Sequence, residues 1–146
     1  MDYIVIKLFN SKSIFLKMKK KYLLLSIISI ILFLYFRILY RPFIYKNNFF
    51  DFYVADTAPN FFPVLVFVFF KKYQDTSINT YIVSSAAFIG LTIYEFFIQH
   101  HIYTSTFDWK DIFASLLASI LAIIICFIIE IKNINIESEH RPHQHS

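Results

Sequence analysis

The side chains best suited to chemistry in this sequence are acids and amides that interrupt or border long apolar stretches. They are Asp56, Asn60, Glu95, Gln99, Asp108 and Asp111. Oxygen ligands of this kind bind hard divalent cations, and Glu95, Asp108 and Asp111 are the candidate metal ligands. The same carboxylates can instead share protons and couple them to transport. The residue types leave both chemistries open, identify no catalytic residue, and suggest a divalent cation as the only cofactor.

Glu95 is the strongest of these candidates for a functional role, because it follows an uncharged run from Thr76 to Tyr94. A charge at the centre of a bilayer costs roughly 2.5–3.5 kcal/mol and less toward its ends. An acid at such a depth is a functional candidate by default, and Gln99 lies four residues later on the same helical face. The plainer alternative is that Glu95 reaches the headgroups or bonds a neighbouring helix.

Helix capping is the plain alternative for the aspartates. Asp56 and Asp108 each suit the N-cap of a helix, because a short carboxylate accepts hydrogen bonds from the first free backbone N–H groups. Asp111 follows three residues after Asp108 and suits the positive end of the helix dipole. Capping alone therefore accounts for each aspartate without any ligand.

Composition identifies the elements that must position these residues. Hydrophobic residues make up 58% of the 146-residue chain and charged residues 16%, against about 45–50% and 25% in ordinary soluble domains. A chain this short exposes much of its surface, and it has too few charges for that surface to face water. The single Cys126 excludes an internal disulfide scaffold or a cysteine-based zinc cluster. The sequence therefore predicts an integral membrane protein.

Four apolar segments are expected to cross the membrane as helices. They run over Tyr22–Tyr40, over Phe61–Phe70 with a start near Asp56, over Thr76–Tyr94 continuing to Gln99, and over Ile112–Ile129. The uncharged runs Thr76–Tyr94 and Ile112–Ile129 match the ~20 residues that a helix needs to cross a bilayer. They are continuously apolar, without the period-two alternation of a barrel strand. The predicted fold is all-α, an integral membrane bundle of four transmembrane helices.

Small residues in the last two of these helices predict close packing between them. The third helix carries Ser84, Ser85, Ala86, Ala87 and Gly90, and the fourth carries Ala114, Ser115, Ala118, Ser119 and Ala122. Small side chains spaced four residues apart let helix backbones approach closely in a membrane. We expect the two helices to form a tight hairpin.

Lysine and arginine counts predict the orientation. With the N-terminus inside, ten of these residues fall on the inner side and four on the outer side, which places both termini in the cytoplasm. The chain then divides into a basic cytoplasmic segment at 1–21, a membrane domain at 22–131 and a polar cytoplasmic tail at 132–146. Residues 1–17 are either a start-site artefact, because Met18 opens a natural-looking membrane-protein start, or a short amphipathic surface segment.

Location and partners follow from the same pattern. Six lysines precede residue 22 and are followed by apolar sequence instead of a nucleic-acid-binding motif. We therefore expect a multi-pass protein of the cytoplasmic (inner) membrane whose basic segment meets anionic lipid, with no nucleic-acid partner. No Ser-His-Asp order, P-loop or HExxH motif is present, so an enzyme is the less favoured interpretation.

Two short motifs resemble the VanZ-like family of small bacterial membrane proteins. Glu95-Phe-Phe-Ile-Gln99 is followed by Thr106-Phe-Asp-Trp-Lys-Asp111 and an apolar helix of small residues. The family pattern is Glu-x3-Gln, a short loop, Arg-Thr-Phe-Asp-x2-Asp and a helix that carries Asn and Gly. Asp56-x3-Asn60 is similar to the family's Asp-x3-His, with Asn in place of His, and Ser105 stands in place of Arg.

The resemblance covers roughly residues 22–131. It implies four membrane helices and a role in the cell envelope, since the founding member is associated with resistance to the glycopeptide teicoplanin. It also implies that Glu95, Gln99, Asp108 and Asp111 act together.

Three functions remain open at this stage. The leading hypothesis is an envelope-associated factor that acts at the outer leaflet on a lipid-linked or cell-wall ligand through an outward-facing acidic site. The first alternative is a small ion or organic-anion transporter with Glu95 as its carrier group, which would have to be a homo-oligomer because four helices are few for a full transport path. The second alternative is a structural membrane scaffold whose acids only cap helices.

Overall fold

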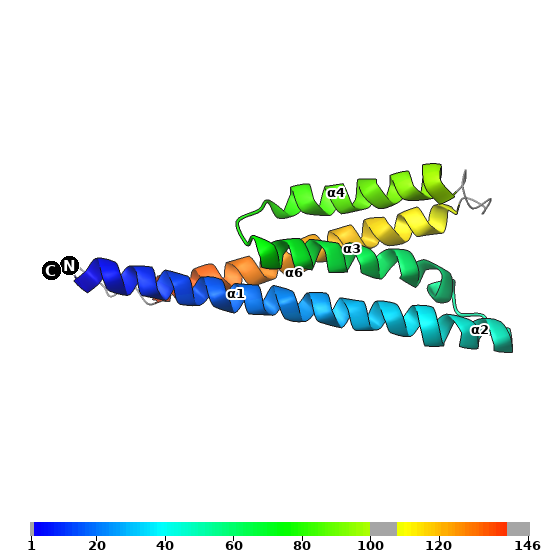
Figure 1. The fold of residues 1–146 in the computed structure, drawn as a ribbon, viewed down its shortest axis with the longest axis horizontal. Coiled ribbons are helices and arrows are strands. Elements are labelled where there is room, and N and C mark those ends of the chain that lie inside the picture. Colours follow the sequence, from blue (N-terminus) through cyan, green and yellow to red (C-terminus); the bar gives the residue numbers. More distant parts are fainter. Residues whose placement is uncertain (1, 100–107, 140–146) are drawn as a thin grey trace.

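The computed structural model describes residues 2–99 and 108–139, with side chains from 15 to 97 and from 108 to 133. Every element within these ranges is helical (Figure 1). In chain order they are α1 (Asp2–Tyr35), the π-helical η1 (Phe36–Tyr40), α2 (Arg41–Asn47), α3 (Val54–Gln74), α4 (Thr80–Ile93), the π-helical η2 (Tyr94–Gln99) and α6 (Trp109–Glu139).

Four helical stretches are long and apolar enough to cross a membrane. They are Phe15–Asn47, Val54–Gln74, Thr80–Phe97 and Trp109–Asn133. The prediction of an all-helical protein with four candidate membrane spans is thereby confirmed.

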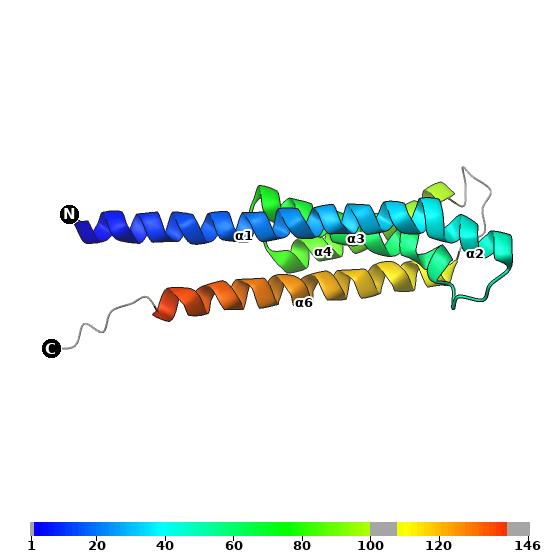
Figure 2. The same ribbon diagram turned by 90° about the horizontal axis from the view of Figure 1, so that it is seen from below.

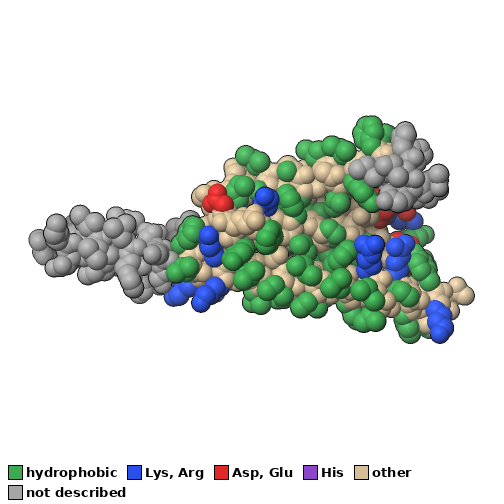
Figure 3. All heavy atoms as spheres, viewed as in Figure 1, with side chains coloured by type: hydrophobic (Ala, Val, Ile, Leu, Met, Phe, Trp, Pro, Cys, Tyr) green, Lys and Arg blue, Asp and Glu red, His purple; other side chains and the backbone are tan. Residues whose placement is uncertain are grey.

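The helices run side by side, with α3 packed against α1, α4 and α6. In both ribbon views α1 begins and α6 ends at the same end of the bundle, beyond the α3–α4 turn (Figures 1 and 2). We call this the terminal end. The opposite end, which we call the acidic end, holds α2, the start of α3, η2 and the start of α6. On the face shown in Figure 3, hydrophobic side chains cover the middle and charged side chains gather toward the two ends.

Capping residues set the helix starts, and several starts differ from the prediction. The first helix begins at Asp2 instead of Tyr22 and continues through η1 and α2 to Asn47, so the basic stretch is part of the same helix. In α4, Asn79 is the N-cap and accepts hydrogen bonds from the N–H groups of Tyr81 and Ile82, at 2.9 and 3.4 Å. This cap places the helix start at Thr80, four residues later than predicted.

The two candidate N-cap aspartates have different outcomes. At the start of α6, Asp108 Oδ1 accepts a hydrogen bond from Lys110 N at 2.9 Å, so its capping role is confirmed. The N-cap interpretation of Asp56 is wrong, because the N-cap position of α3 is Tyr53, at a left-handed φ of 66°. Asp51 takes the capping role instead, since its Oδ2 accepts from Ala55 N at 2.7 Å.

The core is narrow and holds small side chains where α4 meets α6. Ala87, Ala118 and Ala122 are buried, and Ser119 Oγ donates to the Ser84 carbonyl at 3.3 Å. The predicted close packing of these two helices is confirmed. Three of the small residues that we expected there, Ser85, Ala86 and Gly90, are exposed on the other face of α4. Larger apolar residues of α3, among them Val68 and Phe69, fill the bundle between α1 and α6.

Candidate functional site

Side chains from three helices converge at the acidic end. Asn60 of α3, Glu95 of η2 and Asp111 of α6 line one narrow cavity together with Ser115 and the apolar Leu91 and Ile112. The cavity is too narrow to admit a water molecule. Residues separated by up to 51 positions in the sequence are therefore brought together, and all three belong to the predicted candidate site.

Glu95 is turned into the protein and not toward the headgroups. Glu95 is only 3% exposed, and its Oε1 is buried with no hydrogen-bond partner. The carboxylate accepts one hydrogen bond from the backbone N–H of Asp108. Glu95 lies in a π-helical turn, an arrangement that inserts one residue into a helix and is frequent at functional sites. Glu95 therefore does not reach the headgroups, whereas the hydrogen bond from Asp108 at the start of α6 agrees with the other plain alternative, that Glu95 bonds a neighbouring helix.

The neighbouring acids extend the site across the end of the bundle. The Asn60 amide donates to the Asp111 carboxylate. Asp56 accepts hydrogen bonds from the Tyr45 hydroxyl and from Arg41, whose Nη2 is 3.4 Å from Asp56 Oδ1. Arg41 is also close enough to Asp111 for the two charges to interact. We call Arg41, Asp56, Asn60, Glu95, Asp108 and Asp111 the acidic-end cluster.

Arg41 and Tyr45 are members of this site that sequence reasoning missed. Their i, i+4 spacing places them on one helical face, which is a signal in the sequence. It could only be used if the first helix was known to continue past Tyr40 into α2.

An apolar groove lies beside the acidic-end cluster, between the same helices α3 and α6. It has a volume of about 440 Å³ and is lined mainly by aromatic and aliphatic side chains, among them Phe61, Phe62, Phe113 and Leu117. The one charged residue in its lining is Lys110. The Lys110 ammonium lies 3.4 Å from the centre of the Tyr53 ring and 3.8 Å from Asp108 Oδ2.

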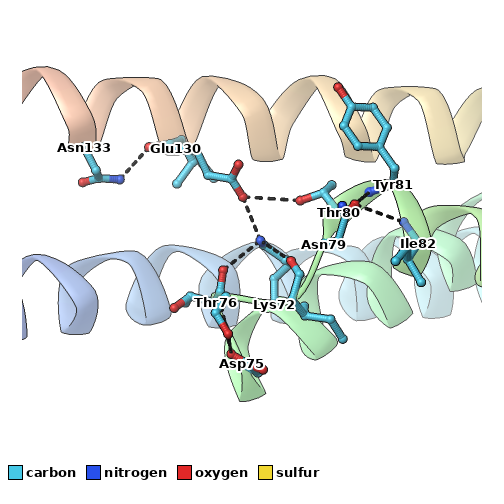
Figure 4. Close-up of polar contacts among 12 residues, drawn as sticks. Lys72, Asp75, Thr76, Asn79, Thr80, Tyr81, Ile82, Glu130 and Asn133 are labelled. Atoms are coloured by element: carbon cyan, nitrogen blue, oxygen red, sulfur yellow. Dashed lines mark hydrogen bonds and ion pairs between the residues drawn. The ribbon is translucent and has the colours of Figure 1, made fainter.

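A second polar network occupies the terminal end and was not predicted (Figure 4). Lys72 Nζ lies 2.7 Å from Glu130 Oε1, which joins α3 to α6. The same ammonium donates to the carbonyls of Thr76 and Ile78, at 2.9 and 3.0 Å. Thr80 Oγ1 donates to Glu130 at 3.3 Å. In the sequence, Lys72 and Glu130 look like simple ends of apolar runs, so only their three-dimensional pairing distinguishes them.

The predicted metal ligands do not form a ligand set in the part of the chain that the structure describes. Within residues 15–97 and 108–133, no three His, Cys, Asp or Glu side chains are grouped so that they could hold a metal ion. Cation binding by Glu95, Asp108 and Asp111 stays a prediction that this geometry does not support. The side chain of Gln99 lies outside the described residues, as do Ser105 and Thr106.

Comparisons with family models, with curated proteins and with solved structures give no match to this chain. The resemblance to the VanZ-like family therefore rests on the residues quoted above.

Proposed function

We propose that this multi-pass membrane protein is a VanZ-like envelope factor that binds an amphiphilic, lipid-linked ligand at its acidic end. The observation that carries the proposal is that the apolar groove and the acidic-end cluster adjoin each other between α3 and α6. On α3, Thr57 and Phe61 line the groove, while the adjacent Asp56 and Asn60 belong to the cluster. A single ligand can therefore place a hydrocarbon body and a polar head on the same pair of helices.

The chemistry of the lining residues defines the ligand class. A groove of about 440 Å³ lies within the range of small-molecule sites and offers an apolar surface for a hydrocarbon chain. Lys110 supplies a positive charge beside the groove for a phosphate group. The carboxylates of Asp56 and Asp108 are partly exposed, so they can accept hydrogen bonds from hydroxyl or amine groups of a sugar or peptide head.

Charge distribution supports an outward-facing acidic end. The lysines that precede residue 22 belong to α1 and lie at the terminal end. Lys71 and Lys72, in the last turn of α3, lie at the same end. Positively charged segments are retained on the cytoplasmic side of a membrane. We therefore assign the terminal end to the cytoplasm and the acidic end to the outer leaflet of the cytoplasmic membrane, where lipid-linked envelope precursors are exposed.

Complementation of a deletion strain tests this function. Glu95→Gln and Asp111→Asn keep the shape of each side chain and remove its charge, so we expect both variants to fail to restore wild-type teicoplanin susceptibility. Asp75→Asn is the matched control, because Asp75 is an exposed acid in the α3–α4 turn at the other end. Equal membrane abundance of the three variants establishes that loss of rescue is not loss of protein. Full rescue by both Glu95→Gln and Asp111→Asn would disprove the proposal.

A further inference from the structure

The apolar groove is elongated along the helix axes and has one charged end. On α6 it is lined by Lys110, Phe113, Ala114 and Leu117, whose spacing follows one face of the helix over about 10 Å. Ala58 of α3 and Ala114 are buried and form its floor, whereas Phe113 and Leu117 are exposed. The groove is therefore open on the side that faces lipid, and Lys110 lies at its end nearest the start of α6.

The Lys110 ammonium at this charged end lies over an aromatic ring. Its nitrogen is 3.4 Å from the centre of the Tyr53 ring, which is a cation–π contact. The four-carbon stem of lysine is flexible, so an ammonium without such a contact samples many positions. The ring fixes the ammonium but carries no opposite net charge, so the positive charge stays available to an anion.

Asp108 neutralises this charge only weakly. Its Oδ2 is 3.8 Å from Lys110 Nζ, and the two side chains are 42% and 44% exposed, where an ion pair contributes little. Its Oδ1 accepts from the Lys110 backbone N–H at 2.9 Å, so the carboxylate also faces the positive end of the α6 dipole. A phosphate that enters the groove can therefore form shorter, charge-assisted hydrogen bonds with the ammonium.

Tyr53 has a backbone conformation that a tyrosine disfavours. Its φ is 66° and that of the preceding Phe52 is 55°, in the left-handed region that glycine adopts far more readily. Tyr53 also occupies the N-cap position of α3 without a side-chain cap hydrogen bond, where Ser, Thr, Asp, Asn or Gly is preferred. Neither the turn nor the helix start explains a tyrosine here. Its ring beneath Lys110 does, and strained residues of this kind cluster at ligand sites.

We propose that Tyr53 is a positioning residue that holds the Lys110 ammonium at the end of the groove and thereby selects lipids with an anionic phosphate head group. The inference rests on the proposed function and names the head group of its ligand. The hydrocarbon chain lies in the groove between α3 and α6, and the phosphate accepts hydrogen bonds from Lys110. A lipid with a zwitterionic head can occupy the same groove but gains less from this ammonium.

Fluorescence quenching in nanodiscs tests the selectivity. The substitutions Trp109→Phe and Phe113→Trp give a protein whose single tryptophan lies in the groove lining. Bromine atoms on a lipid chain quench tryptophan only at close approach. Dibrominated phosphatidic acid or dibrominated phosphatidylcholine is added in increasing fractions to phosphatidylcholine nanodiscs. We expect half-maximal quenching at an about tenfold lower fraction of phosphatidic acid, the factor that one charge-assisted hydrogen bond supplies.

Variants in this background assign the roles. Lys110→Met should abolish the tenfold preference, and Tyr53→Phe, which keeps the ring, should retain it. Tyr53→Gly adopts the left-handed φ without strain and removes only the ring. It should therefore stay folded, lose most of the preference and leave quenching by phosphatidylcholine unchanged. Lys46→Met is the matched control, because Lys46 is an exposed lysine of α2 at the same end of the bundle.

Inorganic phosphate distinguishes a lipid site from a site for the free anion. In excess, it should not relieve the quenching by phosphatidic acid, because only the lipid also occupies the apolar groove. Relief of the quenching would overturn the proposal in favour of a free-phosphate site.

Two further results would overturn it: equal half-maximal fractions for the two lipids without further substitution, or an undiminished preference in Tyr53→Gly. The proposed function fails on a different result. Ala114→Leu fills the floor of the groove, and if it leaves the quenching by both lipids unchanged, lipid does not enter the groove at all. Quenching that Ala114→Leu reduces, but that shows no preference between the lipids, removes only the selectivity assigned to Tyr53 and Lys110.

Discussion

Lys72 and Glu130 form an ion pair of 2.7 Å at the terminal end, between α3 and α6. The Lys72 side chain is 2% exposed and that of Glu130 is 34% exposed. An ammonium group has three protons, and the remaining two are directed at the carbonyls of Thr76 and Ile78 in the α3–α4 turn. One side chain therefore fixes both the neighbouring helix and the turn that leads into α4.

Removal of this ammonium should destabilise the protein strongly. For Lys72→Met we expect a loss of about 2–4 kcal/mol in the free energy of unfolding, somewhat below the 3–5 kcal/mol of a fully buried pair because Glu130 is partly hydrated. The measurement is reversible SDS unfolding in mixed micelles. Lys71→Met is the control because it makes the same substitution one residue earlier. The Lys71 side chain is only half-buried, and its ammonium lies 6.0 Å from the Phe67 ring centre. The double variant Lys72→Met/Glu130→Gln should lose less than Lys72→Met alone, and an equal or larger loss would contradict the assigned ion pair.

The close contact of α4 with α6 should not tolerate a larger side chain. Ala118 is 0% exposed at this interface, so Ala118→Leu is expected to cost about 1–3 kcal/mol through overpacking. Ala86→Leu makes the same substitution on the exposed face of α4 and should stay within about 0.5 kcal/mol of wild type. Thermal unfolding of the two variants in detergent compares them directly, and equal stabilities would show that the helices do not pack as described.

Cysteine labelling in intact cells tests the proposed orientation. Cys126 is fully buried, so Cys126→Ala gives a background without a competing thiol. In this background, Asn48→Cys lies next to α2 at the acidic end and Ser77→Cys lies in the α3–α4 turn. We expect a membrane-impermeant maleimide to label Asn48→Cys in intact cells and Ser77→Cys only after lysis. The reverse pattern would place the acidic end in the cytoplasm.

Asp75, in the α3–α4 turn, has a lowered carboxyl pKa. Hydrogen bonds from the Ser77 hydroxyl and the Ser77 backbone N–H hold the pKa of Asp75 below its ordinary value. Because the folded-state pKa is the lower one, the resulting stabilisation is present above the unfolded-state pKa and is lost as the pH falls through the folded-state pKa. Ser77→Ala should raise the pKa of Asp75 toward the ordinary value. A carbon-13 NMR titration of this carboxyl measures it, with Ser85→Ala as the variant that leaves it unchanged.

Hydropathy and residue size were sufficient to predict the four spans, the packing of α4 on α6 and the cap at Asp108, because each depends on local sequence. The convergence of Asn60, Glu95 and Asp111 followed from placing their helix ends on the same side of the membrane. The Lys72–Glu130 pair could not be predicted, since it depends on how α3 and α6 are rotated toward each other. The contact of Arg41 with Asp56 escaped prediction because it requires the first helix to extend to Asn47.

The first helix, which continues from Asp2 through the π-helical η1 to Asn47, has a mechanical consequence. At 1.5 Å per residue it is roughly 69 Å long, more than twice the ~30 Å of the hydrocarbon layer. If this helix tilts about its midpoint by about 5°, each of its ends moves by about 3 Å. Arg41 near one end of this helix contacts Asp56, so a tilt of the helix would displace the Arg41–Asp56 contact at the acidic end.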